Sequence, residues 1–173
     1  MKKRILVLLS VMLCFMLAAC SAGSMVTIDC SDFTINCPRS WKMKVTEEAT
    51  PGTPIAQIYL PEQENYTSNI VVTAMAVAGL KAEDFTEDYA KDLVETSAES
   101  TGVQFTLDSC EQITLGSRSA VIIRYSGEKD GHNLVISEQL IPMQDMLYRL
   151  TFNCLNDADV EAMDAAMASV AFK

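Results

Sequence analysis

A nearly continuous apolar run from Ile70 to Ala78 is the feature that most constrains the fold of this 173-residue chain. β-branched residues open the run, and its length of nine residues suits a strand better than a helix. Because the run lacks the polar alternation of a half-exposed strand, it predicts a central strand that is buried on both faces. The rest of the chain therefore has to supply neighbouring strands and a cover for each face of the sheet.

Two segments with helical periodicity can supply that cover. In the first, Asp84 and Glu87 resemble a capping box, and Gly102 stands where a glycine ends a helix. The second begins at Asn156 or Asp157 as N-cap, with more acids in its first turn, where the helix dipole favours them. Helical spacing relates Phe85, Tyr89, Leu93, Val94 and Ser97 in the first segment and Val160, Met163, Met167 and Val170 in the second.

The remaining apolar segments have the two-residue period of β-strands. Asp130-Gly131 is the strongest hairpin signal, and residues 103–107 and 113–115 form either a strand pair or one bent strand. About eight strands and two helices predict an α+β fold, an α/β/α sandwich with helices packed on both faces of an antiparallel sheet of about six to eight strands. The other expected strands lie at 26–30, 33–37, 41–45, 55–60, 120–125, 134–141 and 146–154.

The N-terminus has the pattern of a secretory signal. Three basic residues, Lys2, Lys3 and Arg4, precede an apolar run that is too short to span a membrane. The run ends in Leu17-Ala18-Ala19-Cys20, which resembles a bacterial lipobox, in which the signal is cut before the Cys and the Cys thiol carries the acyl chain, such as palmitate. An ordinary secreted protein with a chance Cys20 is the alternative.

The lipobox resemblance implies three segments and a location. Residues 1–19 are a cleaved signal peptide, residues 20–25 are the lipidated Cys20 and a short tether, and residues 26–173 form a single domain. The lipid on Cys20 would anchor the protein to a bacterial cell membrane on its extracytoplasmic face. Ser21 to Ser24 reach roughly 14 Å when fully extended, so the domain is held close to the membrane.

Charge excludes one class of partner and suggests an orientation. Residues 1–19 contain three basic groups and no acid, so cleavage changes the net charge from −10 to −13. A chain this acidic is not expected to bind nucleic acid, whose phosphates require Lys and Arg. The net charge also argues against a surface that binds closely to anionic lipid. We therefore expect the acids to point away from the membrane and the Lys and Arg minority to point toward it.

Four cysteines remain after Cys14 and Cys20 are set aside, namely Cys30, Cys37, Cys110 and Cys154. They permit two disulfides with three connectivities in an oxidising compartment. Cys37 with Cys154 is the favoured pair because each ends a strand-like run, whereas Cys30 and Cys37 are too far apart if both lie in extended chain. Free buried thiols are the alternative, and the scattered spacing does not suit a zinc site.

Catalytic and metal-binding patterns are not found in the sequence. The one histidine, His132, lies in the predicted hairpin turn and is expected to be an exposed turn residue instead of a catalytic base. The alternate acids from Asp157 to Glu161 lack the Gly and Glu that complete a calcium loop, and their place at a helix start explains them. Met143, Met146, Met163 and Met167 are expected to fill the core and not to bind copper. We therefore expect no enzyme, no metal and no cofactor.

Three segments resemble PsbP-like and DcrB-like domains. The segment from Phe33 to Trp41 resembles their F-x-I-x-x-P-x-G-W opening, with Pro38 and Trp41 as the structural motif. Gly116 to Ala120 resembles a small-residue turn of the family, and Ser169 to Phe172 resembles its C-terminal tail. Two departures are Ser40 in place of the usual Gly and Cys37 where an aromatic residue is common. The resemblance implies an α/β/α sandwich over residues 26–173.

What the resemblance implies about function is a binding or assembly module. PsbP assists the oxygen-evolving complex, a relative binds the Ran GTPase, and bacterial members are often anchored lipoproteins. The expected function is therefore a non-enzymatic lipoprotein that binds another extracytoplasmic protein, by a sheet edge or an acidic helix face. A carrier with a pocket for a small apolar ligand between sheet and helix is the alternative, and a hydrolase with an acidic site ranks below it.

Overall fold

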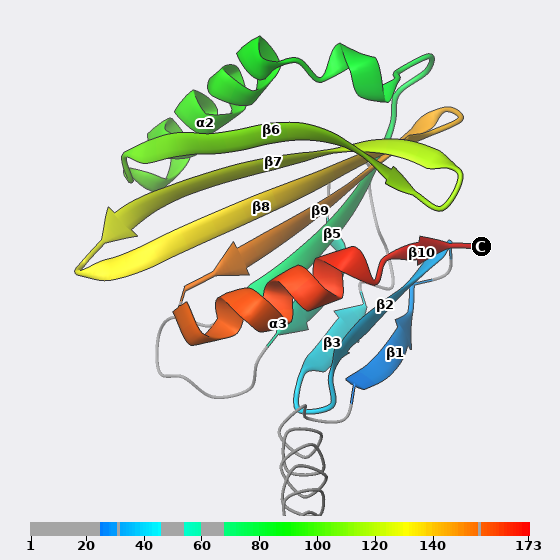
Figure 1. Cartoon of the computed structure of the whole chain (residues 1–173), viewed down its shortest axis with the longest axis horizontal. Coiled ribbons are helices and arrows are strands. Elements are labelled where there is room, and N and C mark those ends of the chain that lie inside the picture. Colours follow the sequence, from blue (N-terminus) through cyan, green and yellow to red (C-terminus); the bar gives the residue numbers. More distant parts are fainter. Residues whose placement is uncertain (1–24, 31, 46–53, 60–67, 156) are drawn as a thin grey trace, which may run out of the picture.

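The computed structural model describes residues 25–30, 32–45, 54–59, 68–155 and 157–173 (Figure 1). No helix within these segments is long and apolar enough to cross a lipid bilayer. The elements are β1 (Met25–Asp29), β2 (Phe33–Pro38), β3 (Lys42–Val45), β4 (Pro54–Tyr59), β5 (Asn69–Ala76), the 3-10 helix η1 (Ala82–Asp84), α2 (Glu87–Thr101), β6 (Phe105–Leu115), β7 (Arg118–Lys129), β8 (His132–Met143), β9 (Met146–Cys154), α3 (Asp157–Ala168) and β10 (Ala171–Phe172).

Two antiparallel sheets form the framework. The large sheet has seven strands in the order β3-β4-β5-β9-β8-β7-β6, and the small sheet has three in the order β1-β2-β10. Helix α2 lies over one face of the large sheet and α3 over the other, so the helices cover opposite faces (Figure 1). The predicted α+β class with helices on both faces of an antiparallel sheet is confirmed. The N-terminal strands, however, leave that sheet and pair with the C-terminal residues in a second one.

Tight turns connect the long strands β6 to β9. Asp130 and Gly131 both have positive φ angles, +54° and +78°, which is the backbone of the favoured two-residue hairpin turn and confirms the prediction for this pair. The segment after α2 is one strand, β6, whose register with β7 shifts between Leu107 and Ser109. The second of the two alternatives, a single bent strand, is therefore the observed one.

Two apolar cores lie on opposite faces of the large sheet. The larger one fills the space between the sheet, α3 and the small sheet, with Phe33, Ile35, Leu150 and Phe152 almost fully buried. The smaller one lies under η1 and α2 and includes the buried Tyr125. The sheet separates the two cores, because alternate residues of each strand point to opposite faces and so contribute to one core or the other.

The strand that is buried on both faces is β8, not β5. Ile70 and Val72 of β5 are fully buried, but Val71 and Thr73 between them are only half-buried. The prediction for this strand is wrong on one face, because the helix that covers that face packs on β6, at the far edge of the sheet (Figure 1). Instead, every residue from Ser137 to Ile141 of β8 is buried.

The helix ends agree with the sequence at one end of α2 and differ at the other. Gly102 ends the helix in a left-handed conformation, with φ of +70°, and its N–H donates to Ala98. The N-cap is Thr86, whose Oγ1 accepts from the Tyr89 N–H at 3.3 Å. The predicted capping box of Asp84 and Glu87 is therefore wrong, since the Asp84 carboxylate accepts from the Lys81 N–H and closes η1. Helix α3 begins at Asp157, and Asn156 lies outside the described residues.

Candidate functional site

An open, polar cleft lies at one end of the large sheet, where η1 faces the turn between β6 and β7. Its volume is about 380 Å³, within the range of small-ligand and peptide-side-chain sites. The lining combines cationic, hydroxyl and amide groups with one carboxylate. The polar residues that line it are Lys81, Glu83, Gln112, Ser117, Arg118 and Ser119.

The walls of the cleft are fixed by local backbone structure. Leu115 pairs with Arg118 across the two-residue turn, and the left-handed φ of +63° at Gly116 is one that glycine adopts without strain. On the opposite wall, the Asp84 carboxylate holds the Lys81 N–H at 2.8 Å, which orients the start of η1. Two segments that are about 30 residues apart in sequence therefore meet across the cleft.

The two cations of the cleft differ in their surroundings. The Lys81 ammonium group lies 3.2 Å from the Glu83 carboxylate, and both side chains are exposed. The Arg118 guanidinium lies over the Phe172 ring, 5.6 Å from its centroid, a cation–π arrangement. Among the residues that the structure describes, no carboxylate forms an ion pair with Arg118. The Phe172 ring thus lies against the Arg118 guanidinium, a group whose N–H donors suit a carboxylate.

A second group of polar residues is buried under α2, around Glu138. The Glu138 side chain is 1 % exposed and accepts bonds from Nε and Nη2 of Arg149 on the neighbouring strand. The Tyr125 hydroxyl donates to Oε1 of Glu138 at 3.0 Å and lies 3.3 Å from the Ser97 hydroxyl of α2. Three donors thus occupy the two oxygens of this carboxylate, as is typical of a structural ion pair.

The ionisation of this network is fixed by its surroundings. Burial raises the pKa of Tyr125 well above its ordinary value, and the charge of Glu138 raises it further. Burial lowers the pKa of Arg149, but the hydrogen bond and charge of Glu138 raise it by more, so the pKa is above its ordinary value. Tyr125 is therefore neutral and Arg149 charged at all physiological pH values. Sequence reasoning missed this network, although Glu138 and Arg149 are the charged residues that interrupt two apolar strands.

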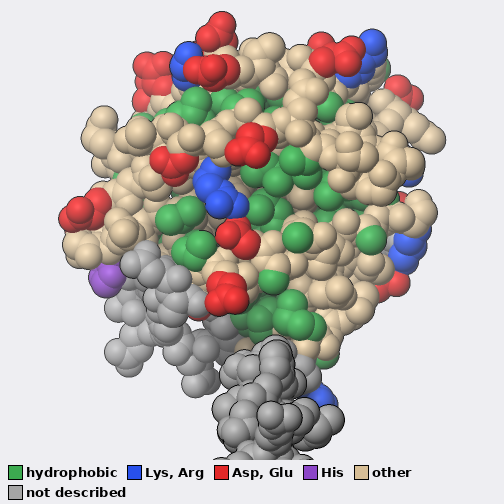
Figure 2. Space-filling model, viewed as in Figure 1, with side chains coloured by type: hydrophobic (Ala, Val, Ile, Leu, Met, Phe, Trp, Pro, Cys, Tyr) green, Lys and Arg blue, Asp and Glu red, His purple; other side chains and the backbone are tan. Residues whose placement is uncertain are grey.

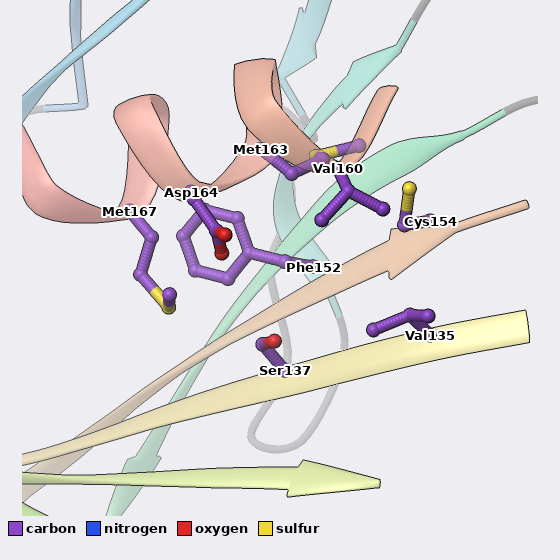
Figure 3. Close-up of a pocket in the computed structure, with 8 residues that line it drawn as sticks. All are labelled: Val135, Ser137, Phe152, Cys154, Val160, Met163, Asp164 and Met167. Carbon is purple, nitrogen blue, oxygen red and sulfur yellow. The ribbon is translucent and has the colours of Figure 1, made fainter. Parts of the chain in front are cut away.

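Between the large sheet and α3, the described residues line a small pocket (Figure 3). About 10 Å³ is open to a water-sized molecule, room for one water at most. Met163, Met167 and Phe152 fill this region, and Asp164 lies at its side, where it binds Arg124 at 2.6 Å. The methionines act here as packing residues, as expected from their helical spacing.

The anchor predicted at Cys20 and the signal peptide lie outside the described residues. Pro38 ends β2, and its carbonyl accepts from the N–H of Trp41 at 2.9 Å. The Trp41 side chain is 6 % exposed and belongs to the larger core. The two residues of the family motif thus close a tight turn and bury the ring behind it.

The cysteines lie in different parts of the structure. Cys30, Cys37 and Cys110 are thiols, so the predicted Cys37–Cys154 disulfide is not formed in the structure. Cys37 belongs to the small sheet and Cys154 ends β9 of the large sheet, and both side chains are buried in the same apolar core. Burial raises the pKa of Cys30 to about 11 and that of Cys37 to about 12, which makes both poor nucleophiles.

The remaining candidates are separated from one another. His132 is exposed at the start of β8, and Met143 pairs with Met146 at the next turn. In α3, the Asp159 carboxylate accepts a hydrogen bond of 2.7 Å from the Ser68 hydroxyl, so a structural role accounts for this acid. The described part of the chain contains no group of three or more His, Cys, Asp or Glu side chains placed to hold a metal ion.

Comparisons of sequence find no relatives. No protein-family model matches the chain, and no curated protein matches it.

Solved structures do share the fold. Cyanobacterial PsbP (CyanoP) from Synechocystis sp. PCC 6803 superposes with a TM-score of 0.68 at 12% identity, covering 88% of this chain and 95% of that one. The Ran-binding protein Mog1p of Saccharomyces cerevisiae gives 0.56 at 9% identity, over 87% of this chain and 96% of its own. LpqN of Mycobacterium tuberculosis, involved in cell envelope biogenesis, gives 0.53 at 16% identity, over 87% and 91%. The chain has a PsbP-like fold, as the sequence resemblance predicted.

Proposed function

We propose that this protein is a lipid-anchored, extracytoplasmic, non-enzymatic lipoprotein that binds another protein through the polar cleft beside Arg118. Cys20 would carry the lipid, as its lipobox-like sequence Leu17-Ala18-Ala19-Cys20 indicates. The partner would present a carboxylate, from an acidic side chain or a chain terminus, to Arg118 and the hydroxyls of Ser117 and Ser119.

The observation that carries this proposal is that the cleft and Met25 lie at opposite ends of the small sheet. Met25, the last residue of the expected tether and the first that the structure describes, pairs with Pro38 at one end of β2. Arg118 lies over Phe172, which pairs with Phe33 at the other end of β2. The two ends are about 16 Å apart along the strand. A domain held by Cys20 would thus direct the cleft away from the membrane.

The proteins that share the fold support a binding function. Mog1p is a Ran-binding protein, and LpqN is involved in cell envelope biogenesis, so a PsbP-like domain can serve as a binding module and can belong to a cell envelope. A shared fold alone does not determine the function, so the residues of the cleft carry the specific proposal.

The two other functions receive less support from the geometry. A carrier of a small apolar ligand needs several hundred Å³ between sheet and helix, whereas the pocket beneath α3 offers about 10 Å³. A hydrolase with an acidic site needs a carboxylate that can reach a substrate, and the buried Glu138 is already bound by Arg149 and Tyr125.

Position-specific photo-crosslinking in cells that express the full chain tests the proposal. A photoreactive residue replaces Ser117 in the cleft or, as the matched control, Asn133, an exposed residue of β8 outside it. We expect one protein to crosslink from position 117 and not from position 133, and Arg118→Glu to abolish this product. Equal crosslinking from both positions, or a product that Arg118→Glu leaves unchanged, contradicts the proposed cleft.

The anchor is tested separately. Mass spectrometry of the mature protein should find an N-terminal acylated Cys20, and Cys20→Ala should move the protein from the membrane fraction to the soluble fraction. An unmodified Cys20 in a membrane-bound protein rejects the lipid anchor.

A further inference from the structure

We propose that the end of the domain next to the tether is a docking surface for anionic phospholipid headgroups. This surface, the basic end, consists of Met25, Arg39, Lys42, Met43 and Lys44. The inference rests on the proposed lipid anchor at Cys20 and adds an orientation: the domain would be seated on the membrane and not merely tethered to it.

The basic end is a single region in space, although its residues come from three elements. Met25 opens β1 and lies opposite Pro38, the last residue of β2. Arg39 lies in the turn that the hydrogen bond between Trp41 and Pro38 closes. Lys42 follows at once as the first residue of β3, an edge strand of the large sheet. Figure 1 shows the start of β1, the end of β2 and the start of β3 at the same end of the molecule.

Charge is separated along the β1–β2 hairpin. Arg39, Lys42 and Lys44 are exposed, and no acid lies among the described residues from Phe33 to Val45. Asp29 and Asp32 lie at the opposite end of the hairpin, where Lys173 contacts Asp29 at 2.7 Å and the Tyr148 hydroxyl donates to Asp32.

This separation runs against the charge of the whole chain. From Cys20 on, the chain has a net charge of −13 and ten basic residues, three of which fall within the six positions from Arg39 to Lys44. Many of the Asp and Glu side chains gather instead along the edge of the molecule formed by α2 (Figure 2). The acidic edge would be repelled by an anionic bilayer and the basic end attracted to it, so both charges favour the same orientation.

Two exposed methionines give the basic end an apolar component. Met25 is 44 % exposed and Met43 is 40 % exposed, and they are two of the three exposed large hydrophobic residues in the described part of the chain. Met43 leaves β3 on the opposite face from Lys42 and Lys44, so the edge strand brings apolar and basic side chains to this end of the molecule from its two faces. At a lipid interface the former reach the acyl boundary and the latter bind phosphate.

The length of the tether brings this surface to the membrane. Five residue steps separate Cys20 from Met25, and a fully extended chain covers at most about 18 Å in that number of steps. An acyl chain in the bilayer therefore keeps Met25 within that distance of the headgroups. The basic end lies around Met25, so it is the first part of the described domain to reach them.

Amide hydrogen exchange of the mature, lipidated chain tests this orientation. The protein is reconstituted in vesicles of phosphatidylcholine alone or with about one third phosphatidylglycerol, and exchange is followed across residues 38–45. We expect exchange there to be several-fold slower in the anionic vesicles, since each basic residue near such a surface raises the docked population about fivefold. High salt should remove the difference.

A matched pair of double variants separates a local effect from a change in net charge. Lys42→Glu with Lys44→Glu should abolish the protection, whereas Lys91→Glu with Lys129→Glu, which changes the net charge equally on exposed residues elsewhere, should keep it. Circular dichroism verifies that all variants are folded. Equal exchange in both kinds of vesicle, or equal effects of the two double variants, overturns the proposed surface. Mass spectrometry of the same sample distinguishes failure of the docking surface from failure of the anchor. If the anchor is wrong, Cys20 carries no lipid, whereas failure of the docking surface alone leaves Cys20 acylated.

Discussion

Two arginine–carboxylate pairs on opposite faces of the large sheet show how differently the two faces are built. On the α2 face, Arg149 binds Glu138, whose side chain is 1 % exposed. On the α3 face, Arg124 binds Asp164 of the helix, and these side chains are 33 % and 44 % exposed. The two arginine side chains are about equally exposed, at 32 % and 33 %, so the pairs differ in their carboxylates, of which Glu138 is buried and Asp164 is not.

The difference follows from what covers each face. The α3 face is covered by a helix and a second sheet, which together enclose a large apolar core. The α2 face is covered mainly at its β6 edge, and its smaller core includes Tyr125, whose hydroxyl donates to the buried Glu138. A buried charged side chain is held in place by a few specific hydrogen bonds, and no other group nearby can replace them. An apolar core is held in place by close packing. Removal of one charged partner should therefore lower the free energy of unfolding strongly on the α2 face and only slightly on the α3 face.

Arg149→Met should have the largest effect on stability. Methionine keeps much of the length of the side chain but leaves the Glu138 carboxylate buried with Tyr125 as its remaining donor. We expect a loss of about 3–5 kcal/mol in the free energy of unfolding, measured by urea denaturation. The double variant Glu138→Leu with Arg149→Met should recover most of this loss. A loss below about 1 kcal/mol in the single variant would show that the buried pair is not structural.

Leu150→Ala and Leu140→Ala compare the packing of the two faces. Both leucines are fully buried, Leu150 in the larger core and Leu140 in the smaller one. Each should cost about 2–4 kcal/mol, with the larger loss for Leu150→Ala, because α3 and the small sheet hold the walls of its cavity apart. Thermal and urea unfolding measure both. A larger loss for Leu140→Ala would reverse the proposed contrast.

Tyr148→Phe tests the link between the two sheets on the α3 face. The Tyr148 hydroxyl donates to the Asp32 carboxylate at 2.5 Å, so its removal should cost about 1.5 kcal/mol at pH 7. Burial, followed by the bond to Asp32, raises the pKa of Tyr148 to about 12, above the value of about 10 in an unfolded chain.

The pH dependence of this bond has a definite sign. Because the folded pKa is the higher one, the stabilisation is complete below pH 10 and is lost as the pH rises through about 12. The difference in unfolding free energy between the wild type and Tyr148→Phe should therefore shrink over this window. A difference that stays constant up to pH 12 contradicts the assignment, and the other tyrosines cancel in the comparison.

Local signals in the sequence predicted the elements and several of their ends. Asp130-Gly131 and Gly102 adopt left-handed backbone conformations that few other residues tolerate, so their meaning does not depend on tertiary structure. The cap of α2 was harder to predict, because Asp84, Thr86 and Glu87 compete within four residues. The Asp84 carboxylate accepts from the Lys81 N–H at the start of η1, so Thr86 is the residue that caps α2.

Burial was predicted less well, because it depends on where the helices pack. The apolar run in β5 predicted the most buried strand, but α2 does not extend over it. The strand that is buried on both faces, β8, contains Ser137, Glu138 and Gln139, whose polarity concealed it. Their partners, among them Arg124, Arg149 and the Met167 carbonyl, come from other elements.

The cleft was predictable only in part. Gly116 to Ala120 has the composition of a turn, but nothing local to it indicates that η1 lies opposite. Lys81 lies in the segment between β5 and α2, and it lines the cleft because of where the fold places that segment. The local sequence gives no signal of this position. A site assembled by two distant segments requires the fold, whereas the lipobox-like Cys20 is recognised from four consecutive residues.

Asp164→Asn should have the smallest effect of the five single substitutions and completes the comparison of the two ion pairs. Water screens the Arg124–Asp164 pair, because the Arg124 side chain is 33 % exposed and the Asp164 side chain is 44 % exposed. Arg124 also keeps its 3.1 Å bond to the Ser137 hydroxyl, so the variant leaves no buried charge without a partner. We expect a loss of about 0.2–1 kcal/mol that declines further at high salt. A loss as large as that of Arg149→Met would show that the α3 face, too, depends on its charges and not on its packing.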